Sequence, residues 1–208
     1  MSAQRPSLFA AHPWHGVHPG EDAPEELTAY VEMVPTDLVK YELDKDSGLL
    51  KADRPIKFSS VPPSLYGFIP RTLCGDSVGA RCAARLRRSG VGGDADPMDI
   101  CILTERPFVH GNVLVQVMPV GGLRMVDRNE ADDKIIAVLK GDAVWSGLDD
   151  VSQLPAALIE RLQHYFLTYK LTPGMQTSHV EIAEVYGRDE AHETIRCSFE
   201  DYRRAYSV

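Results

Sequence analysis

"GGDADPMDICIL" (residues 92–103) places three aspartates, Asp94, Asp96 and Asp99, directly before an apolar run. The run at 100–103 has the short, continuous apolar character of a buried strand. Two like charges about 5 Å apart repel by about 3 kcal/mol at an effective dielectric constant of 20. Three carboxylates at the mouth of a buried strand are therefore costly unless cations compensate them. The stretch predicts either a cation site at a strand end or a solvated, aspartate-rich turn.

A second acidic group, "DRNEADDK" (127–134), also adjoins an apolar run and favours the cation site. Acidic groups at strand ends of a small barrel can converge on one rim. Oxygen ligands suit Mg²⁺, with Mn²⁺ as a substitute, whereas zinc would favour histidine or cysteine. A calcium-binding EF-hand loop starting at Asp94 is excluded, because Asp99 replaces its required glycine and a strand follows instead of a helix.

Length and composition indicate one soluble globular domain over residues 1–208. The chain is 44% hydrophobic and 25% charged, with a net charge of −8. That charge argues against non-specific binding to nucleic acid or to anionic membranes. Four cysteines without CxxC spacing predict reduced thiols. Because no apolar run approaches about 18 residues and no signal peptide is recognisable, we expect a cytoplasmic location.

Periodicity predicts strands first and helices afterwards, which indicates an α+β fold with a small closed barrel. Prolines and glycines make residues 1–26 an irregular N-terminal arm, in which His12, His15 and His18 surround Trp14. We expect that arm to dock with Trp14 buried and not to bind metal. Two further features are a basic inserted loop at 71–93 and a proline-rich segment at 61–70 that excludes a central strand and a helix. We expect the inserted loop to be solvated or to form a short helix, with cover over the acidic groups or a subunit contact as the alternatives. The expected strands lie at 28–34, 39–43, 49–54, 100–104, 112–118, 122–127, 134–139 and 179–187, and the expected helices at 155–170 and 188–205.

"DADPMDI" resembles the signature of the family I soluble inorganic pyrophosphatases, in which Asp, a small or polar residue, Asp-Pro, an apolar residue and Asp follow one another. Six further segments occur in the family's order over residues 30–170. The resemblance implies a five-stranded OB-like closed barrel with flanking C-terminal helices. The segments are "YVEMVP" with Glu32, "VKYELD" with Lys40 and Glu42, "LKADRP" with Arg54, "LYGFIP" with Tyr66, the second acidic group with Asp127, Asp132 and Lys134, and "HYFLTYK" with Tyr169 and Lys170.

The resemblance also implies an activity, namely Mg²⁺-dependent hydrolysis of inorganic pyrophosphate to two orthophosphates by a metal-activated water. Members of the family usually assemble as homo-oligomers, and dimer and hexamer both stay open. The implied site comprises the general base Asp96, the metal ligands Asp94, Asp99, Asp127, Asp132 and Glu42, the substrate-binding residues Lys40, Arg54, Tyr66, Lys134, Tyr169 and Lys170, and the supporting residue Glu32.

The sequence departs from the family pattern in two places near the site. Ala95 stands where the family prefers Gly, Ser, Asn or Asp, so we expect the turn to avoid a left-handed backbone there. Pro62 stands where many members carry a second active-site tyrosine, so one phosphate contact is either missing or supplied by another residue.

Two other functions are weighed against hydrolysis. A barrel of this kind can bind single-stranded nucleic acid, but that requires a basic groove with exposed aromatic side chains. Aromatic residues make up only 8% of this acidic chain. A catalytically silent relative is the other alternative, and the intact aspartate set argues against it.

Overall fold

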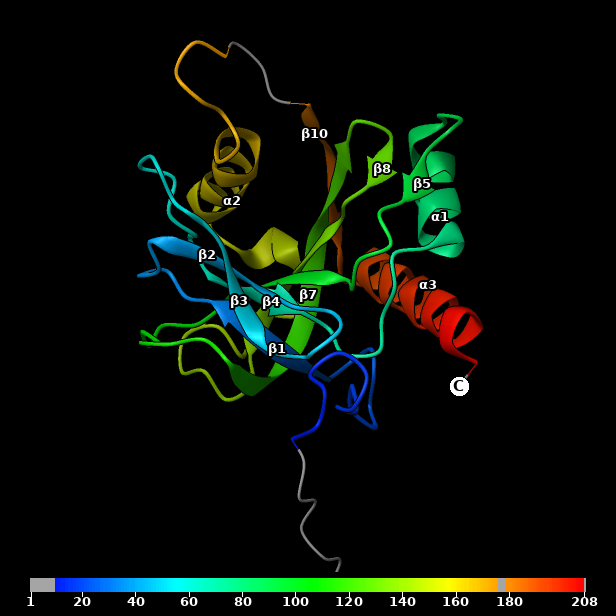
Figure 1. Cartoon of the computed structure of the whole chain (residues 1–208), viewed down its shortest axis with the longest axis horizontal. Helices are drawn as coiled ribbons and strands as arrows, with labels where there is room; N and C mark the ends of the chain where they lie inside the picture. Colours follow the sequence, from blue (N-terminus) through cyan, green and yellow to red (C-terminus); the bar gives the residue numbers. More distant parts are fainter. Residues whose placement is uncertain (1–9, 176–178, 208) are drawn as a thin grey trace, which may run out of the picture.

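A mixed sheet carries three α-helices in the computed structural model, which describes residues 10–175 and 179–207 (Figure 1). This confirms the predicted α+β class. The helices are α1 (Asp76–Leu86), α2 (Ala156–Thr168) and α3 (Arg188–Tyr206), with a short 3₁₀ turn at Val151–Gln153. The strands are β1 (Leu27–Met33), β2 (Val39–Leu43), β3 (Leu50–Pro55), β4 (Leu65–Phe68), β5 (Gly92–Gly93), β6 (Asp99–Leu103), β7 (Val113–Asp127), β8 (Glu130–Ala131), β9 (Lys134–Leu139) and β10 (Val180–Gly187).

The large sheet follows the order β1-β4-β6-β9-β7-β8-β5, and β10 pairs with β7. β1 also pairs with β7, so each of the five strands β1, β4, β6, β9 and β7 has two of the others as neighbours. The pairing of β6 with β9 is parallel, whereas the other pairings among these five are antiparallel. β2 and β3 form the predicted hairpin as a separate two-stranded sheet.

Alternate residues of the central strands enter two different cores, as the two faces of a buried sheet require. On β6, Ile100 and Ile102 pack in the core that includes Val78 of α1 and Ile195 of α3. Cys101 and Leu103 pack in the other core, together with Leu162 and Phe166 of α2. Helix α2 therefore lies on one side of the sheet, and α1 and α3 lie on the other, as Figure 1 shows.

The 61–70 segment corrects one expectation, because it does contain a central strand. β4 pairs with β1 on one side and with β6 on the other. Its residues 65–68 carry no proline; Pro62, Pro63 and Pro70 flank the strand and remove no donor from its ladder. The prolines bound this strand and do not prevent it.

The strands predicted at 112–118 and 122–127 are a single strand, β7. Its register with β9 shifts between Pro119 and Gly121. A Cβ atom at Gly122 would lie 2.5 Å from the ring of Tyr186 on β10. Gly121 and Gly122 therefore allow the register shift and the close approach of β10.

The predicted inserted loop contains a short helix, α1, whose Val78 and Cys82 are buried. The N-terminal arm docks as expected over its described part: Trp14 is buried, and its Nε1 donates a hydrogen bond to the carbonyl oxygen of Thr72 at 2.7 Å. His15 Nδ1 lies 2.7 Å from the hydroxyl of Tyr202. Residues 1–9 of the arm lie outside the described residues. No helix in the described ranges is long and apolar enough to span a membrane.

Candidate active site

Two parallel strand pairings bring the acidic groups to one edge of the sheet. β5 pairs with β8 so that Gly93 is opposite Ala131. The next residue after Gly93 is Asp94, and the next residue after Ala131 is Asp132. β6 pairs with β9 so that Asp99 is opposite Lys134. The aspartates that the sequence separates by more than thirty residues therefore share one rim.

A cavity of about 250 Å³ opens at this rim, and two neighbouring hollows of about 470 and 380 Å³ adjoin it. Every predicted site residue lines at least one of the three. The first is lined by Lys40, Tyr66, Asp94, Asp96, Asp99, Asp127, Asp132, Lys134, Tyr169 and Lys170, the second adds Glu32 and Glu42, and the third adds Arg54.

Lys134 is the buried cation at the centre of the rim. Its side chain is only 3% exposed, and its Nζ contacts the carboxylates of both Asp99 and Asp132. Burial alone would lower the pKa of Lys134, but the Asp132 and Asp99 carboxylates outweigh it and hold that pKa well above its ordinary value. The ammonium group thus neutralises charge that Asp99 and Asp132 would otherwise place in a poorly solvated site.

Asp94 and Asp132 remain under-compensated in spite of Lys134. Burial, assisted by repulsion from Asp132 and Asp99, raises the pKa of Asp94 to about 7. Burial raises the pKa of Asp132 as well. Carboxylates in this condition favour binding either a proton or a cation, and their hard oxygen atoms fit Mg²⁺. Within residues 10–175 and 179–207, no three His, Cys, Asp or Glu side chains already stand in a chelating arrangement.

The turn that carries Asp96 is held by backbone hydrogen bonds. The amide nitrogen of Asp96 donates to Asp94 Oδ1 at 2.9 Å, and the amide nitrogen of Ala95 donates to the carbonyl oxygen of Cys74 at 3.0 Å. The expectation for Ala95 is wrong: its φ is +61°, in the left-handed region. The two flanking hydrogen bonds, together with that from the Cys74 amide to the carbonyl oxygen of Asp96, fix the backbone in a conformation that alanine alone would avoid.

Lys45 is a site residue that the sequence did not reveal. It lies in the turn of the β2–β3 hairpin, and its ammonium group contacts the carboxylate of Asp96. Its carbonyl oxygen lies 3.0 Å from Nε2 of His12 in the N-terminal arm. The hairpin turn itself was the only local signal at this position, so the contact depends on how the hairpin folds over the sheet.

Tyr165 was also missed, because its helical spacing favours a core position. It lines the first and third hollows and stacks on Tyr169 with ring centroids 5.1 Å apart. Pro62, at the usual tyrosine position, lines none of the three hollows.

Cationic side chains surround the acidic rim, and each has an acidic partner. Lys40 Nζ lies 2.8 Å from Glu42 Oε2 and 3.2 Å from Asp53 Oδ2. Lys170 Nζ lies 2.7 Å from Asp127 Oδ2. Lys40 pairs with Arg54 across the β2–β3 hairpin, and Arg54 contacts Asp53.

Glu32 is buried behind this rim. Its Oε1 accepts a hydrogen bond from the amide of Leu43 at 2.7 Å, yet burial and repulsion from Asp99 raise its pKa to about 8. A site that offers carboxylates for cations beside lysines and an arginine for phosphoryl oxygens suits a small polyanion that binds together with metal.

Comparison with known proteins agrees with this chemistry. The inorganic pyrophosphatase family profile matches residues 29–203. An inorganic pyrophosphatase of Chlamydia trachomatis serovar L2 is 48% identical over 199 residues, which cover 94% of this chain and 95% of that protein. A soluble inorganic pyrophosphatase of Zea mays is 36% identical over 193 residues, covering 93% of this chain and 80% of that protein. The crystal structure of an inorganic pyrophosphatase from Thermus thermophilus superposes with a TM-score of 0.77 at 29% identity, covering 93% of this chain and 99% of that one.

Proposed function

The chain belongs to the inorganic pyrophosphatase family and is an inorganic diphosphatase, and we propose that its hydrolysis of pyrophosphate depends on Mg²⁺ and uses Asp96 as general base. The observation that carries the proposal is the convergence of Asp94, Asp99 and Asp132 around Lys134 at one cavity. Pyrophosphate is a small polyanion, and its hydrolysis requires charge neutralisation, an activated water and a held leaving group.

Asp94, Asp99 and Asp132 would hold the activating cations, with Asp127 helping to bind a further ion that arrives with the substrate. Glu42 would contact that substrate-borne ion through water, and Glu32 would support the rim. When bound, Mg²⁺ supplies charge neutralisation and activation of water. The raised pKa of Asp94 supports its role, because burial has made its isolated charge unfavourable and a divalent ion restores the balance.

Asp96 would take the proton from the attacking water. Its side chain is 52% exposed and lines the cavity, while its backbone is fixed through Cys74 and Asp94. A fixed backbone with an accessible carboxylate suits a base that must reach a water molecule without itself being buried among the ligands.

The substrate-binding residues would clamp the phosphoryl oxygens, Arg54 through its fork and the lysines as point charges. They are Lys40, Arg54, Tyr66, Lys134, Tyr169 and Lys170. Burial raises the pKa of Tyr66 well above its ordinary value, so its hydroxyl keeps its proton and is available as a donor. Tyr165 would donate to the phosphoryl oxygen that many family members bind with a tyrosine where this chain has Pro62.

Each of the strands β1, β4, β6, β9 and β7 pairs with two others of this set. This pairing supports the OB-like barrel, which we include in the proposal. We also propose a single domain over residues 1–208 and assembly into homo-oligomers, which the family resemblance implies. Free thiols at all four cysteines support a cytoplasmic location.

The direct test is phosphate release from pyrophosphate by the purified chain, with Mg²⁺ and with EDTA. We expect release only with Mg²⁺. Release that continues at an undiminished rate in EDTA would contradict the metal dependence, and no release under either condition would contradict the proposed function.

A further inference from the structure

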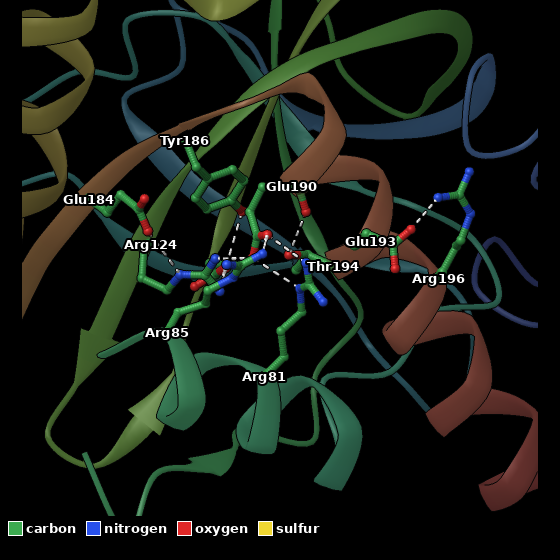
Figure 2. A network of polar contacts seen from close by, with 10 residues as sticks. Arg81, Arg85, Arg124, Glu184, Tyr186, Glu190, Glu193, Thr194 and Arg196 are labelled. Atoms are coloured by element: carbon green, nitrogen blue, oxygen red, sulfur yellow. Dashed lines mark hydrogen bonds and ion pairs between the residues drawn. The ribbon is translucent and has the colours of Figure 1, made fainter. Parts of the chain in front are cut away.

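Arg124 is a fully buried arginine outside the cavity, next to the rim. Its side chain is 1% exposed and lies on β7. Its guanidinium is 3.1 Å from Asp133 Oδ2 and 2.5 Å from Glu190 Oε1, and it covers the ring of Tyr186 at 4.7 Å. Figure 2 shows Arg124, Tyr186 and Glu190 converging from different elements.

Asp133, its partner, fills a gap in the sheet. β8 ends at Ala131 and β9 begins at Lys134, and both pair with β7. In the interval, the amide of Asp132 donates to the carbonyl oxygen of Met125 at 3.0 Å. The amide of Met125 donates in turn to Asp133 Oδ1 at 3.3 Å. A carboxylate therefore replaces the missing backbone acceptor where the ladder is interrupted.

The position of Asp133 decides where its two neighbours point. Along extended chain, successive side chains alternate between faces. Asp133 points inward to Arg124 and Tyr186, whose hydroxyl donates to Asp133 Oδ2 at 3.1 Å. Asp132 and Lys134, on either side of it, both line the cavity.

The network reaches outward to α1 through Glu190, in the first turn of α3. Arg81 Nε donates to Glu190 Oε1 at 2.9 Å, and Arg85 Nε donates to the same oxygen at 3.1 Å. Arg81 and Arg85, drawn below Glu190 in Figure 2, approach it from α1. The 71–93 segment, which continues through Gly93 into Asp94, is thereby tied to the residues beside Asp132.

We propose that the Arg124–Asp133 pair is a positioning device that holds Asp132 and Lys134 at the metal- and substrate-binding rim. The inference rests on the proposed function of that rim. Stability alone is a poor explanation for the pair, because apolar residues of similar volume in place of a buried ion pair often leave a protein as stable or more stable. Orientation of a ligand through hydrogen bonds of its neighbour is a common reason for such contacts.

The test compares Mn²⁺ binding by metal titration, without substrate, in the full-length chain and in the double variant Arg124→Met/Asp133→Leu. We expect the double variant to fold and to bind Mn²⁺ about 10- to 100-fold more weakly. The variant Asp133→Asn keeps an acceptor for the Met125 amide but loses the charge that pairs with Arg124, so we expect its Mn²⁺ affinity to lie between those of the parent chain and the double variant. Thermal unfolding of each metal-free variant reports stability separately.

The matched control is Arg88→Met/Glu181→Leu, the same substitutions in an exposed ion pair with 3.0 Å separation. It should bind Mn²⁺ like the parent chain. Unchanged Mn²⁺ affinity in the folded Arg124→Met/Asp133→Leu variant would overturn the positioning role.

If the double variant does not fold, Asp133→Asn decides, because it removes the charge that pairs with Arg124 at nearly constant side-chain volume. Weaker Mn²⁺ binding in Asp133→Asn supports the inference, and unchanged binding overturns it. A parent chain that binds no Mn²⁺ would instead contradict the proposed function itself.

Discussion

Asp99 and Lys134 lie directly opposite each other in the parallel pairing of β6 with β9, and the lysine ammonium contacts the aspartate carboxylate. Strand register therefore places a compensating cation at the acidic rim. Lys134 also contacts Asp132, which lies two residues before it in the chain. One buried ammonium group thus links the two acidic segments.

Replacing this lysine should make folding depend on metal. Lys134→Met leaves buried carboxylates without their partner, and we expect the free energy of unfolding in EDTA to fall by about 3–5 kcal/mol. Saturating Mg²⁺ should restore part of that loss, because the ion binds only the native state. Urea unfolding in EDTA and in Mg²⁺ measures both effects.

The control is Lys140→Met, which breaks an exposed pair with Glu26 and should change stability by at most about 1 kcal/mol. A Lys134→Met chain that is as stable as the parent in EDTA would contradict the compensating role.

Asp96→Asn should separate catalysis from metal binding. The amide cannot accept the proton from water, so turnover should fall by about 10²- to 10⁴-fold. Mn²⁺ affinity should stay close to that of the parent chain, because Asp96 is not among the proposed ligands. Steady-state phosphate release and Mn²⁺ titration check the two halves, and undiminished turnover would remove Asp96 as the base.

Ala95→Gly should stabilise the chain. The left-handed backbone at Ala95 costs an L-residue about 1–2 kcal/mol, and glycine would relieve this strain. Glycine also raises the conformational entropy of the unfolded chain, which offsets part of the gain in stability. We expect a net gain of about 0.5–1 kcal/mol in the free energy of unfolding, measured in urea. The same substitution at Ala83, inside α1, should instead lower stability by about 1 kcal/mol. Equal losses at both positions would show that the turn imposes no strain.

Glu32→Gln should alter the pH dependence of stability. The pKa of Glu32 rises from 4.5 to about 8 on folding, chiefly through burial. Between these values the native chain holds a proton that the unfolded chain has lost, so the Glu32 contribution to stability falls as pH rises. The glutamine variant lacks this loss. The free energy of unfolding of the glutamine variant, relative to that of the parent chain, should therefore rise by on the order of 2–4 kcal/mol between pH 4.5 and 8.

Urea unfolding in EDTA across this pH range measures the difference between the two chains. Glu200→Gln, which changes an exposed partner of Arg204, serves as the control. A difference between Glu32→Gln and the parent that stays constant with pH would contradict the raised pKa.

Local patterns predicted most of the elements, and the resemblance to the pyrophosphatase signature implied the membership of the proposed site. The β2–β3 hairpin, β6, β10 and the two C-terminal helices follow from alternation, helical spacing and turn residues. The acidic groups could be assigned to strand ends because each adjoins an apolar run. The structure places all the predicted site residues on adjoining hollows.

What the sequence did not predict depends on contacts between distant segments. β4 is a central strand in spite of its flanking prolines. The backbone of Ala95 is left-handed because Cys74 forms backbone hydrogen bonds with both Ala95 and Asp96. Lys45 meets Asp96 only when the hairpin lies over the sheet. The burial of Arg124 beside Asp133 likewise results from packing among β7, β10 and α3, which no local spacing encodes.

The most direct test of the account is Mn²⁺ binding, followed by electron paramagnetic resonance, in Asp94→Asn, Asp132→Asn and the double variant. If the two acidic segments share an ion, each single variant should weaken its binding by about tenfold or more, and the double variant should be little worse than either. Two results would contradict the shared ion. One is Mn²⁺ affinity like that of the parent chain in both single variants, and the other is a loss of affinity in the double variant equal to the product of the two single losses.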